Sequence, residues 1–393
     1  MSNIKQNYTD FDEYIRQGEP SQKEKASIWQ TAIGLQAVDR LQTSDYLKAT
    51  ACKHIEGQID IDEARELINS YYQSKTLREP DDDEKLEADK VSANITKILS
   101  SQTLDFSTGG YISVHRRVFD GVFKHAGKLR DYDITKREWV LDGDTINYLN
   151  WEDLRRAIDY DITQEKEFSY KGISTDTMVE HITRFVSGLW QIHAFCEGNT
   201  RTTAVFTILY LRSIGFKVDN SLFARHSWYF RNALVRANYK NAIKGIDYTS
   251  VYLERFFRNL LLGEEWDLRN RYLHIHATDE WKVQQNLAGG TSNKQEEYKH
   301  GTSTGQVQDK LRTDNANIRR LIIVIGNQEL SVKSMMDALE LKGRDNFQNL
   351  YLKPAISEGY VRLLYPNSPR HPRQKYLLTV KGLTVFEYCN KSK

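Results

Sequence analysis

The stretch His193-Ala194-Phe195-Cys196-Glu197-Gly198-Asn199-Thr200-Arg201 lies between two segments of strong helical periodicity. The apolar stripe before it consists of Met178, Ile182, Phe185, Val186, Leu189 and Ile192. The core face after it consists of Val205, Ile208, Leu209 and Leu211, and Gly215 is suited to end that helix. Spacings of three and four residues are typical of amphipathic helices, so we expect a polar loop where two helices meet.

The residue types in this loop point to chemistry on a phosphate. His193, at a helix end, can titrate near neutral pH and act as a base, and Glu197 offers the hard oxygen that Mg²⁺ prefers. Gly198 permits close backbone approach, and Asn199 is a good N-cap for the following helix. The free amides of that helix form an anion site, over which Arg201 places a forked cation. Together they predict phosphoryl or nucleotidyl transfer.

The loop resembles the motif of the Fic family, H-x-F-x-[D/E]-G-N-x-R-x-x-R. Every fixed position through the first arginine matches: His193, Phe195, Glu197, Gly198, Asn199 and Arg201. The segment from His115 to Trp139 is similar to the family's preceding helix and substrate-docking flap. The resemblance extends over about Trp29 to Leu262, and many members also carry a C-terminal winged helix.

The resemblance implies a protein adenylyltransferase that uses ATP and Mg²⁺. His193 would act as general base on a Tyr, Thr or Ser hydroxyl of a target protein, which then attacks the α-phosphate. Glu197 would hold Mg²⁺, and Phe195 would anchor the loop in the core. The phosphates would be cradled by four consecutive residues, Gly198, Asn199, Thr200 and Arg201.

Other contacts are implied outside the loop. The flap, expected as a β-hairpin over Ile134 to Leu141 that turns at Asp142-Gly143, would pair with an extended segment of the target. Tyr229 and Asn232, on the following helix, would contact adenosine. Core packing for Tyr229 and a surface amide for Asn232 are equally good interpretations.

The sequence departs from the family pattern at Ala194, Cys196, Thr200 and Ala204, and Ala204 replaces the second motif arginine. Cys52 to Gly57 resembles the inhibitory pattern [S/T]-x-x-x-E-[G/N], with Glu56 as its glutamate. We expect Glu56 to reach Arg201 or the γ-phosphate site and to restrain activity weakly. The alternative is that Glu56 only closes its helix, with Gly57 as the C-terminal cap.

The fold is predicted to be mainly α and to have four parts. They are an N-terminal helical region over 1–100 with a possible inhibitory helix, a Fic core over 101–277, a polar linker over 278–316, and a winged helix-turn-helix over 317–393. The last part is expected to contain helices at Ile318–Gly326, Val332–Leu341 and Arg344–Ser357, and strands at Tyr360–Leu364 and Lys375–Val380.

Composition sets the remaining expectations. The 393 residues carry a net charge of +2, so no overall charge excess marks a nucleic-acid or membrane protein. The polar N-terminus, the short apolar runs and three scattered cysteines favour a cytoplasmic protein without membrane contact. A second hypothesis is a DNA-binding regulator, with Lys342, Arg344 and Lys353 on phosphates and Arg370 and Arg373 on the wing. Protein docking by the winged helix is its alternative.

Overall fold

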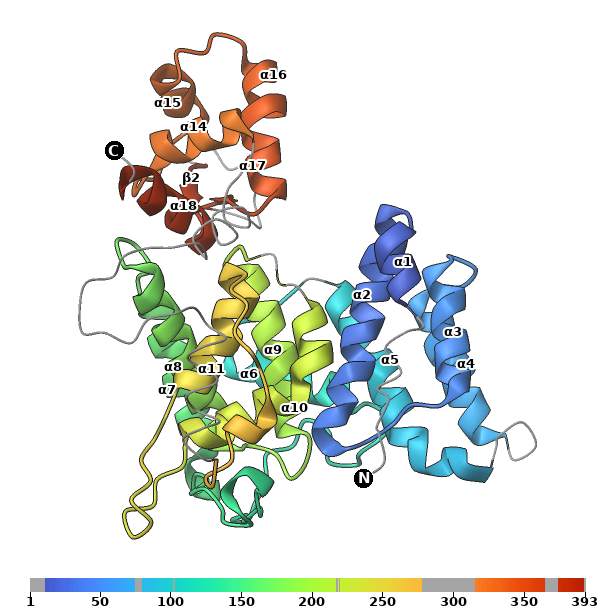
Figure 1. Cartoon of the computed structure of the whole chain (residues 1–393). Coiled ribbons are helices and arrows are strands. Elements are labelled where there is room, and N and C mark those ends of the chain that lie inside the picture. Colours follow the sequence, from blue (N-terminus) through green and yellow to red (C-terminus); the bar gives the residue numbers. More distant parts are fainter. Residues whose placement is uncertain are drawn as a thin grey trace.

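The structure, a computed structural model, describes residues 11–74, 80–101, 103–216, 218, 220–277, 315–364 and 374–391. Most of the expected linker lies outside these ranges, as do Arg370 and Arg373 of the expected wing. The described chain is mainly helical, as predicted (Figure 1). None of its helices combines the length and the apolar composition needed to cross a lipid bilayer.

Eleven α-helices precede residue 277 in the described ranges. They are α1 (Asp12–Gln17), α2 (Pro20–Gly34), α3 (Asp45–Ile55), α4 (Ile61–Gln73), α5 (Leu86–Ser100), α6 (Thr108–Val118), α7 (Leu154–Glu167), α8 (Thr175–Ile192), α9 (Asn199–Ser213), α10 (Asn220–Ala237) and α11 (Val251–Phe257). Short 3₁₀ turns or π-helical segments are η1 (Leu35–Asp39), η2 (Pro80–Lys85), η3 (Trp139–Leu141), η4 (Trp151–Asp153), η5 (Arg258–Leu262) and η6 (Asn270–Tyr272).

The C-terminal residues form α14 (Ala316–Ile325), α15 (Val332–Ala338), α16 (Arg344–Phe347), η7 (Gln348–Leu352), α17 (Lys353–Ser357), β1 (Val361–Leu363), β2 (Tyr376–Leu378) and α18 (Val380–Lys391). Strands β1 and β2 pair antiparallel, with Arg362 opposite Leu377. Leu330 adds an isolated bridge to Tyr376. Three helical segments followed by a hairpin are the order expected for a winged helix, and both strands lie within their predicted ranges.

Buried side chains form three clusters, and the largest unites α5 to α11 around the predicted loop. A second joins α1 to α4, and a third lies wholly within the C-terminal residues. Helix α2 connects the first two clusters because it packs on both α5 and α10. The approach is closest at Gly34, where an added Cβ would lie 2.4 Å from the carbonyl oxygen of Ala224.

The β-hairpin predicted over Ile134 to Leu141 is not formed. The structure has no strand there: residues 134–138 are irregular, and Trp139–Leu141 form the 3₁₀ turn η3. Val140 and Leu141 are both fully buried, whereas a strand would send adjacent side chains to opposite faces. The turn at Asp142-Gly143 was predicted correctly: both residues have positive φ, and Gly143 N–H donates to Glu138 O at 3.0 Å.

Candidate active site

His193 ends helix α8 in the left-handed conformation, with φ 49° and ψ 56°. A non-glycine residue in this region marks a backbone that the surroundings hold in place. Its imidazole is only 4 % exposed and packs on the Tyr148 ring at 4.1 Å and edge-on to Trp190 at 5.4 Å between centroids. Within the described ranges, neither Nδ1 nor Nε2 has a hydrogen-bond partner. A buried imidazole with two unpaired nitrogens is costly unless a ligand uses them.

The surroundings of His193 keep its ring neutral. Burial is the main cause that holds its pKa well below the ordinary value, and the charges of Lys136, Arg231 and Arg130 act in the same direction. A neutral imidazole carries one nitrogen that can accept a proton. The ring is therefore in the basic form at neutral pH.

Arg130 binds the C-terminal end of α8, a role that the sequence analysis did not predict. Its side chain is fully buried, and Nε donates to His193 O at 2.8 Å while Nη2 donates to Ile192 O at 3.4 Å. Its backbone N–H donates to Ala194 O at 3.0 Å. Carbonyls at a helix end lack intrahelical partners, so one arginine satisfies three of them in a row. Its guanidinium also reaches two carbonyls beside the flap, those of Tyr132 and Leu149.

The loop closes on itself through Asn199. Its Oδ1 accepts from Phe195 N–H at 2.9 Å, and its Nδ2 donates to Phe195 O at 2.7 Å. The prediction that Asn199 is the N-cap is therefore wrong. Gly198 occupies the N-cap position, and Asn199 is the first residue of α9. The Asn199 side chain instead binds both backbone groups of Phe195, which gives two hydrogen bonds in place of one cap bond.

His115 supports the loop from α6, and its role also escaped sequence reasoning. Its Nδ1 accepts from Gly127 N–H at 2.8 Å, so its Nε2 carries the proton toward Glu197 O at 3.1 Å. The ring stacks on Phe195 at 3.7 Å between centroids, which confirms Phe195 as core. Burial lowers the pKa of His115 to about 4, which keeps this bonding pattern intact at neutral pH.

Gly198 leaves no space for another residue. Its φ is +75°, and an added Cβ would lie 2.1 Å from the Phe119 ring. The first turn of α9 begins here: Thr202 N–H reaches back to Gly198 O at 3.0 Å, so the amides before it have no intrahelical acceptor. Thr200 is buried and accepts from Trp190 Nε1 through Oγ1 at 2.9 Å. An anion at this turn would therefore be bound by the backbone N–H groups and the helix dipole.

Glu197 is the exposed carboxylate of the loop. Its side chain is 57 % exposed and pairs with Lys136 Nζ, from the flap, at 3.1 Å. In the described ranges, no group of three or more His, Cys, Asp or Glu side chains could hold a metal ion. Mg²⁺ is commonly bound by one or two carboxylates together with substrate phosphates. A single accessible carboxylate beside an anion site fits a magnesium–nucleotide complex.

Arg201 does not extend over the anion site. The side chain is 2 % exposed and faces the N-terminal helices, where Nη2 donates to Glu87 Oε1 at 2.6 Å and Nη1 to Gln36 Oε1 at 3.0 Å. Its Nε forms an ion pair with Asp39 Oδ2 at 2.8 Å, outside hydrogen-bond geometry. The predicted placement of Arg201 over the phosphate is thus wrong, because the carboxylates of Glu87 and Asp39 bind its guanidinium group instead.

Glu56 does not meet Arg201. It accepts from Tyr14 Oη at 2.5 Å and from Gln58 Nε2 at 2.7 Å, on an exposed surface. It follows the last residue of α3, and Gly57 has the positive φ of a helix end. The expected contact between Glu56 and Arg201 is therefore wrong, and the alternative, a helix-closing glutamate, describes Glu56. Acidic partners of Arg201 do come from the N-terminal region, but from η1 and α5.

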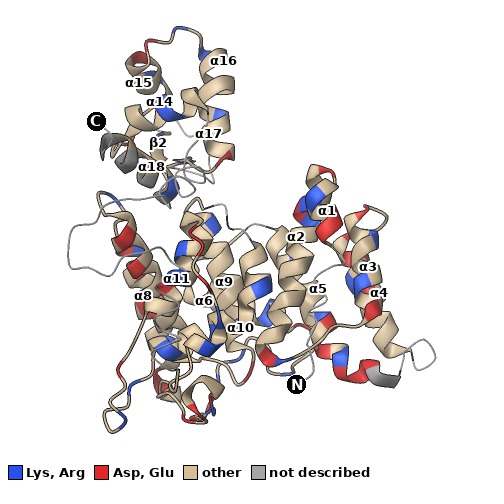
Figure 2. Ribbon diagram, viewed as in Figure 1, with Lys and Arg blue, Asp and Glu red and all other residues tan. Residues whose placement is uncertain are grey.

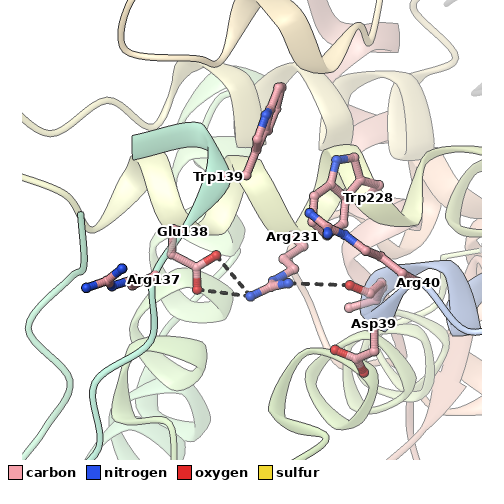
Figure 3. Close-up of a pocket in the computed structure, with 8 residues that line it drawn as sticks. Asp39, Arg40, Arg137, Glu138, Trp139, Trp228 and Arg231 are labelled. Atoms are coloured by element: carbon pink, nitrogen blue, oxygen red, sulfur yellow. Dashed lines mark hydrogen bonds and ion pairs between the residues drawn. The ribbon is translucent and has the colours of Figure 1, made fainter. Parts of the chain in front are cut away.

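A cavity of about 280 Å³ opens between η1, the flap and α10 (Figure 3). Its lining residues are Val38, Asp39, Arg40, Arg137, Glu138, Trp139, Trp228 and Arg231. The guanidinium groups of Arg40 and Arg231 lie 5.4 and 5.3 Å from the centre of the Trp228 ring. Arg231 Nη2 also binds both oxygens of buried Glu138, at 3.0 and 2.9 Å.

Two contacts link this cavity to the loop. Asp39, in its wall, pairs with Arg201, and Glu138 accepts from the hydroxyl of Tyr148 at 3.3 Å. Tyr148 in turn packs on His193. The cavity therefore adjoins both the base candidate and the helix that follows it.

The structure does not bring Tyr229 and Asn232 to this cavity. Tyr229 is fully buried and donates to Tyr252 O at 3.2 Å, so core packing describes it. Asn232 is 1 % exposed and donates through Nδ2 to Asn270 Oδ1 at 2.7 Å. Trp228 and Arg231, each one position before these residues in α10, line the cavity instead.

The sequence matches the Fic/DOC family over residues 105–211 and the family described as "Filamentation induced by cAMP protein Fic-like, C-terminal domain" over residues 316–379. A solved structure, the crystal structure of a Fic family protein from Desulfovibrio desulfuricans G20 at 2.70 Å resolution, aligns over 94 % of each chain, with 15 % identity and a TM-score of 0.39. No protein of curated function matches. The chain thus contains a Fic/DOC domain over residues 105–211 and a Fic-like C-terminal domain over residues 316–379. Members of this family commonly catalyse AMPylation or related transfers.

Proposed function

We propose that this protein transfers AMP from ATP to a hydroxyl group of a target protein. The observation that carries the proposal is His193: a neutral, buried imidazole whose two nitrogens have no hydrogen-bond partner among the described residues, six residues before α9 begins at Asn199. A base beside an anion site is the arrangement that a hydroxyl nucleophile and a phosphate require. The Fic/DOC match over the same residues supports it.

In the proposed reaction, His193 accepts the proton of a Tyr, Thr or Ser hydroxyl. The hydroxyl oxygen bonds to the α-phosphorus, the bond from that phosphorus to the bridging oxygen breaks, and pyrophosphate leaves. The backbone N–H groups of Asn199, Thr200 and Arg201 stabilise the charge on the phosphate oxygens, since the helix dipole favours negative charge there.

Glu197 would hold Mg²⁺, which when bound neutralises negative charge on the nucleotide phosphates. The carboxylate is accessible for this and has one protein partner, Lys136. We propose that Lys136 also contributes positive charge beside the phosphates. Arg201 acts as a positioning residue, because its guanidinium ties the start of α9 to η1 and α5.

We propose that the cavity beside the loop takes the adenosine. Trp228 and Trp139 offer aromatic surfaces, and Glu138 and Arg231 offer polar groups at its wall (Figure 3). Trp139 is 43 % exposed, which leaves its ring available to a base. The target protein would meet the outer side of the flap, residues 134–141, where Arg137 is exposed.

The experiment is transfer of label from [α-³²P]ATP to proteins of a cell lysate and to the chain itself. His193→Ala is expected to lose transfer by at least a hundredfold, the range for removal of a general base. His181→Gln is the matched control on the same helix, away from the loop. Labelling by His193→Ala at the parent rate would show that His193 is not the base.

A further inference from the structure

The C-terminal residues carry the positive charge of the chain. Residues 317–393 contain thirteen Lys or Arg against six Asp or Glu, whereas the whole chain has a net charge of only +2. Figure 2 shows lysines and arginines on α14, α16 and α17, and Arg320, Arg344 and Lys353 among them are exposed. A local excess of this size attracts polyanions even though the molecule as a whole is close to neutral.

The helix formed by α16, η7 and α17 has one face in the core and one uncovered. Phe347, Tyr351, Leu352 and Ala355 are buried. The opposite stripe is exposed and consists of Asn346, Asn349, Leu350, Lys353 and Ser357. These positions recur at spacings of three and four residues, so they share one helix face.

The connection to α15 gives this helix a helix-turn-helix setting. Ser331 caps α15 by accepting from Ser334 N–H, and Glu340 adopts φ 58° in the turn that follows. Strand β1 follows the second helix directly, and β2 pairs with it. A second helix of this kind lies in the major groove of DNA and contacts base edges through its exposed residues.

The chemistry of the exposed stripe fits base edges. Asparagine pairs with adenine, lysine with guanine, and an apolar side chain contacts the methyl group of thymine. Lys353 Nζ already donates to Asn349 Oδ1 at 2.9 Å, which holds the two side chains together. The stripe contains no acidic residue, and Lys342 and Arg344 are exposed at the start of the helix, where phosphates would lie.

We propose that the C-terminal domain binds duplex DNA, with Asn349, Leu350 and Lys353 in the major groove. The contact between the two parts of the chain leaves this stripe uncovered: Gly359 and Thr379 lie against Gly215 at the end of α9. Figure 1 shows α15 and α16 on the side of the domain away from the Fic domain. This binding is independent of the proposed AMP transfer.

The test is fluorescence anisotropy of the full chain with a randomised 24-base-pair duplex, followed by selection of bound sequences. The affinity is expected to fall at least tenfold between 50 and 200 mM salt. Lys353→Glu should weaken binding at least tenfold, while Lys171→Glu, an exposed lysine of the Fic domain, should change it less than twofold. On a selected duplex, Asn349→Ala should lose about fivefold or more and relax one base position.

Three results would overturn the proposal. They are no duplex binding at 50 mM salt, equal binding by Lys353→Glu and the parent, and tighter binding of an RNA hairpin than of the duplex. Lys353 and Asn349 are exposed, so thermal unfolding should show that both variants fold like the parent. Because the measurement needs no ATP, its failure would leave the proposed transfer unaffected.

Discussion

The motif loop is irregular over residues 193–198 and the flap over residues 134–138, yet the two segments are held in different ways. The loop is locked by buried polar groups of other elements, above all Arg130 and His115. The flap is anchored at the buried pair Glu138–Arg231 and exposes Arg137 and Trp139. Irregular backbone keeps one shape where its polar groups are buried and paired. The difference suits a fixed catalytic loop beside a surface that receives partners.

The largest effect is expected at Arg130. Arg130→Ala would leave the carbonyls of Ile192 and His193 buried without donors, so the free energy of unfolding should fall by about 3 kcal/mol or more. Arg137→Ala in the flap should change it by less than about 0.5 kcal/mol, because that side chain is exposed. Urea unfolding measures both. Equal losses would show that the loop and the flap are held alike.

Alanine substitutions at Gly198 in the loop and at Gly143, just after the flap, compare the two segments through the stability that each variant loses. Gly198 and Gly143 have similar positive φ, +75° and +79°, but an added Cβ at Gly143 meets nothing within 4 Å. Gly143→Ala should therefore cost only the backbone strain, about 1–2 kcal/mol. Gly198→Ala adds a clash with Phe119 and should cost about 1–3 kcal/mol more. If the two variants unfold at the same urea concentration, the close approach at Gly198 is not what the structure shows.

We expect the free energy of unfolding to fall at acid pH because His115, which supports the loop, becomes protonated. Burial lowers the folded-state pKa of His115 to about 4, below the unfolded value near 6.5. The unfolded chain therefore binds the proton first, and stability is lost as the pH falls from about 6.5 toward 4, by up to about 1.4 kcal/mol per pH unit. His115→Gln should reduce that slope by the same amount. Parallel stability–pH curves for the parent and the variant would contradict this.

The smallest effect is expected where the loop and the flap touch. Lys136 and Glu197 form an ion pair whose side chains are 28 % and 57 % exposed. Such pairs contribute about 0–1 kcal/mol, so Lys136→Ala should hardly change the thermal midpoint. A shift of the size expected for Arg130→Ala would mean that the flap clamps the loop.

Sequence reasoning found the helices around the loop because apolar periodicity is local. It also singled out Gly198, but for approach to a ligand, whereas the structure requires glycine there because of its φ of +75° and its contact with the Phe119 ring. It could not find the roles of Arg130 and His115, because the backbone groups of the loop that they bind, His193 O and Glu197 O, lie 63 and 82 residues away in the sequence. It misplaced Arg201 for a similar reason: Glu87 and Asp39 meet it only after α2 and α5 pack on the Fic domain.

The predictions of a β-hairpin flap and of a contact between Glu56 and Arg201 are wrong for different physical reasons. The mix of β-branched and aromatic residues over 134–141 favours a strand, but burial of both Val140 and Leu141 in one core requires a turn. Glu56 satisfies a short pattern, yet its helix end lies on the exposed surface beside Tyr14. A pattern of a few residues does not specify which surface a helix end meets.

The central claim is AMP transfer with His193 as the base, and the position of the transferred label tests it most directly. The parent and His193→Ala are incubated with lysate proteins, Mg²⁺, and ATP labelled at either the α- or the γ-phosphate. Relative to lysate without the added protein, we expect additional protein-bound label from [α-³²P]ATP alone, and its loss in His193→Ala. Additional label from [γ-³²P]ATP, or undiminished additional α-label in His193→Ala, would contradict AMP transfer with His193 as the base.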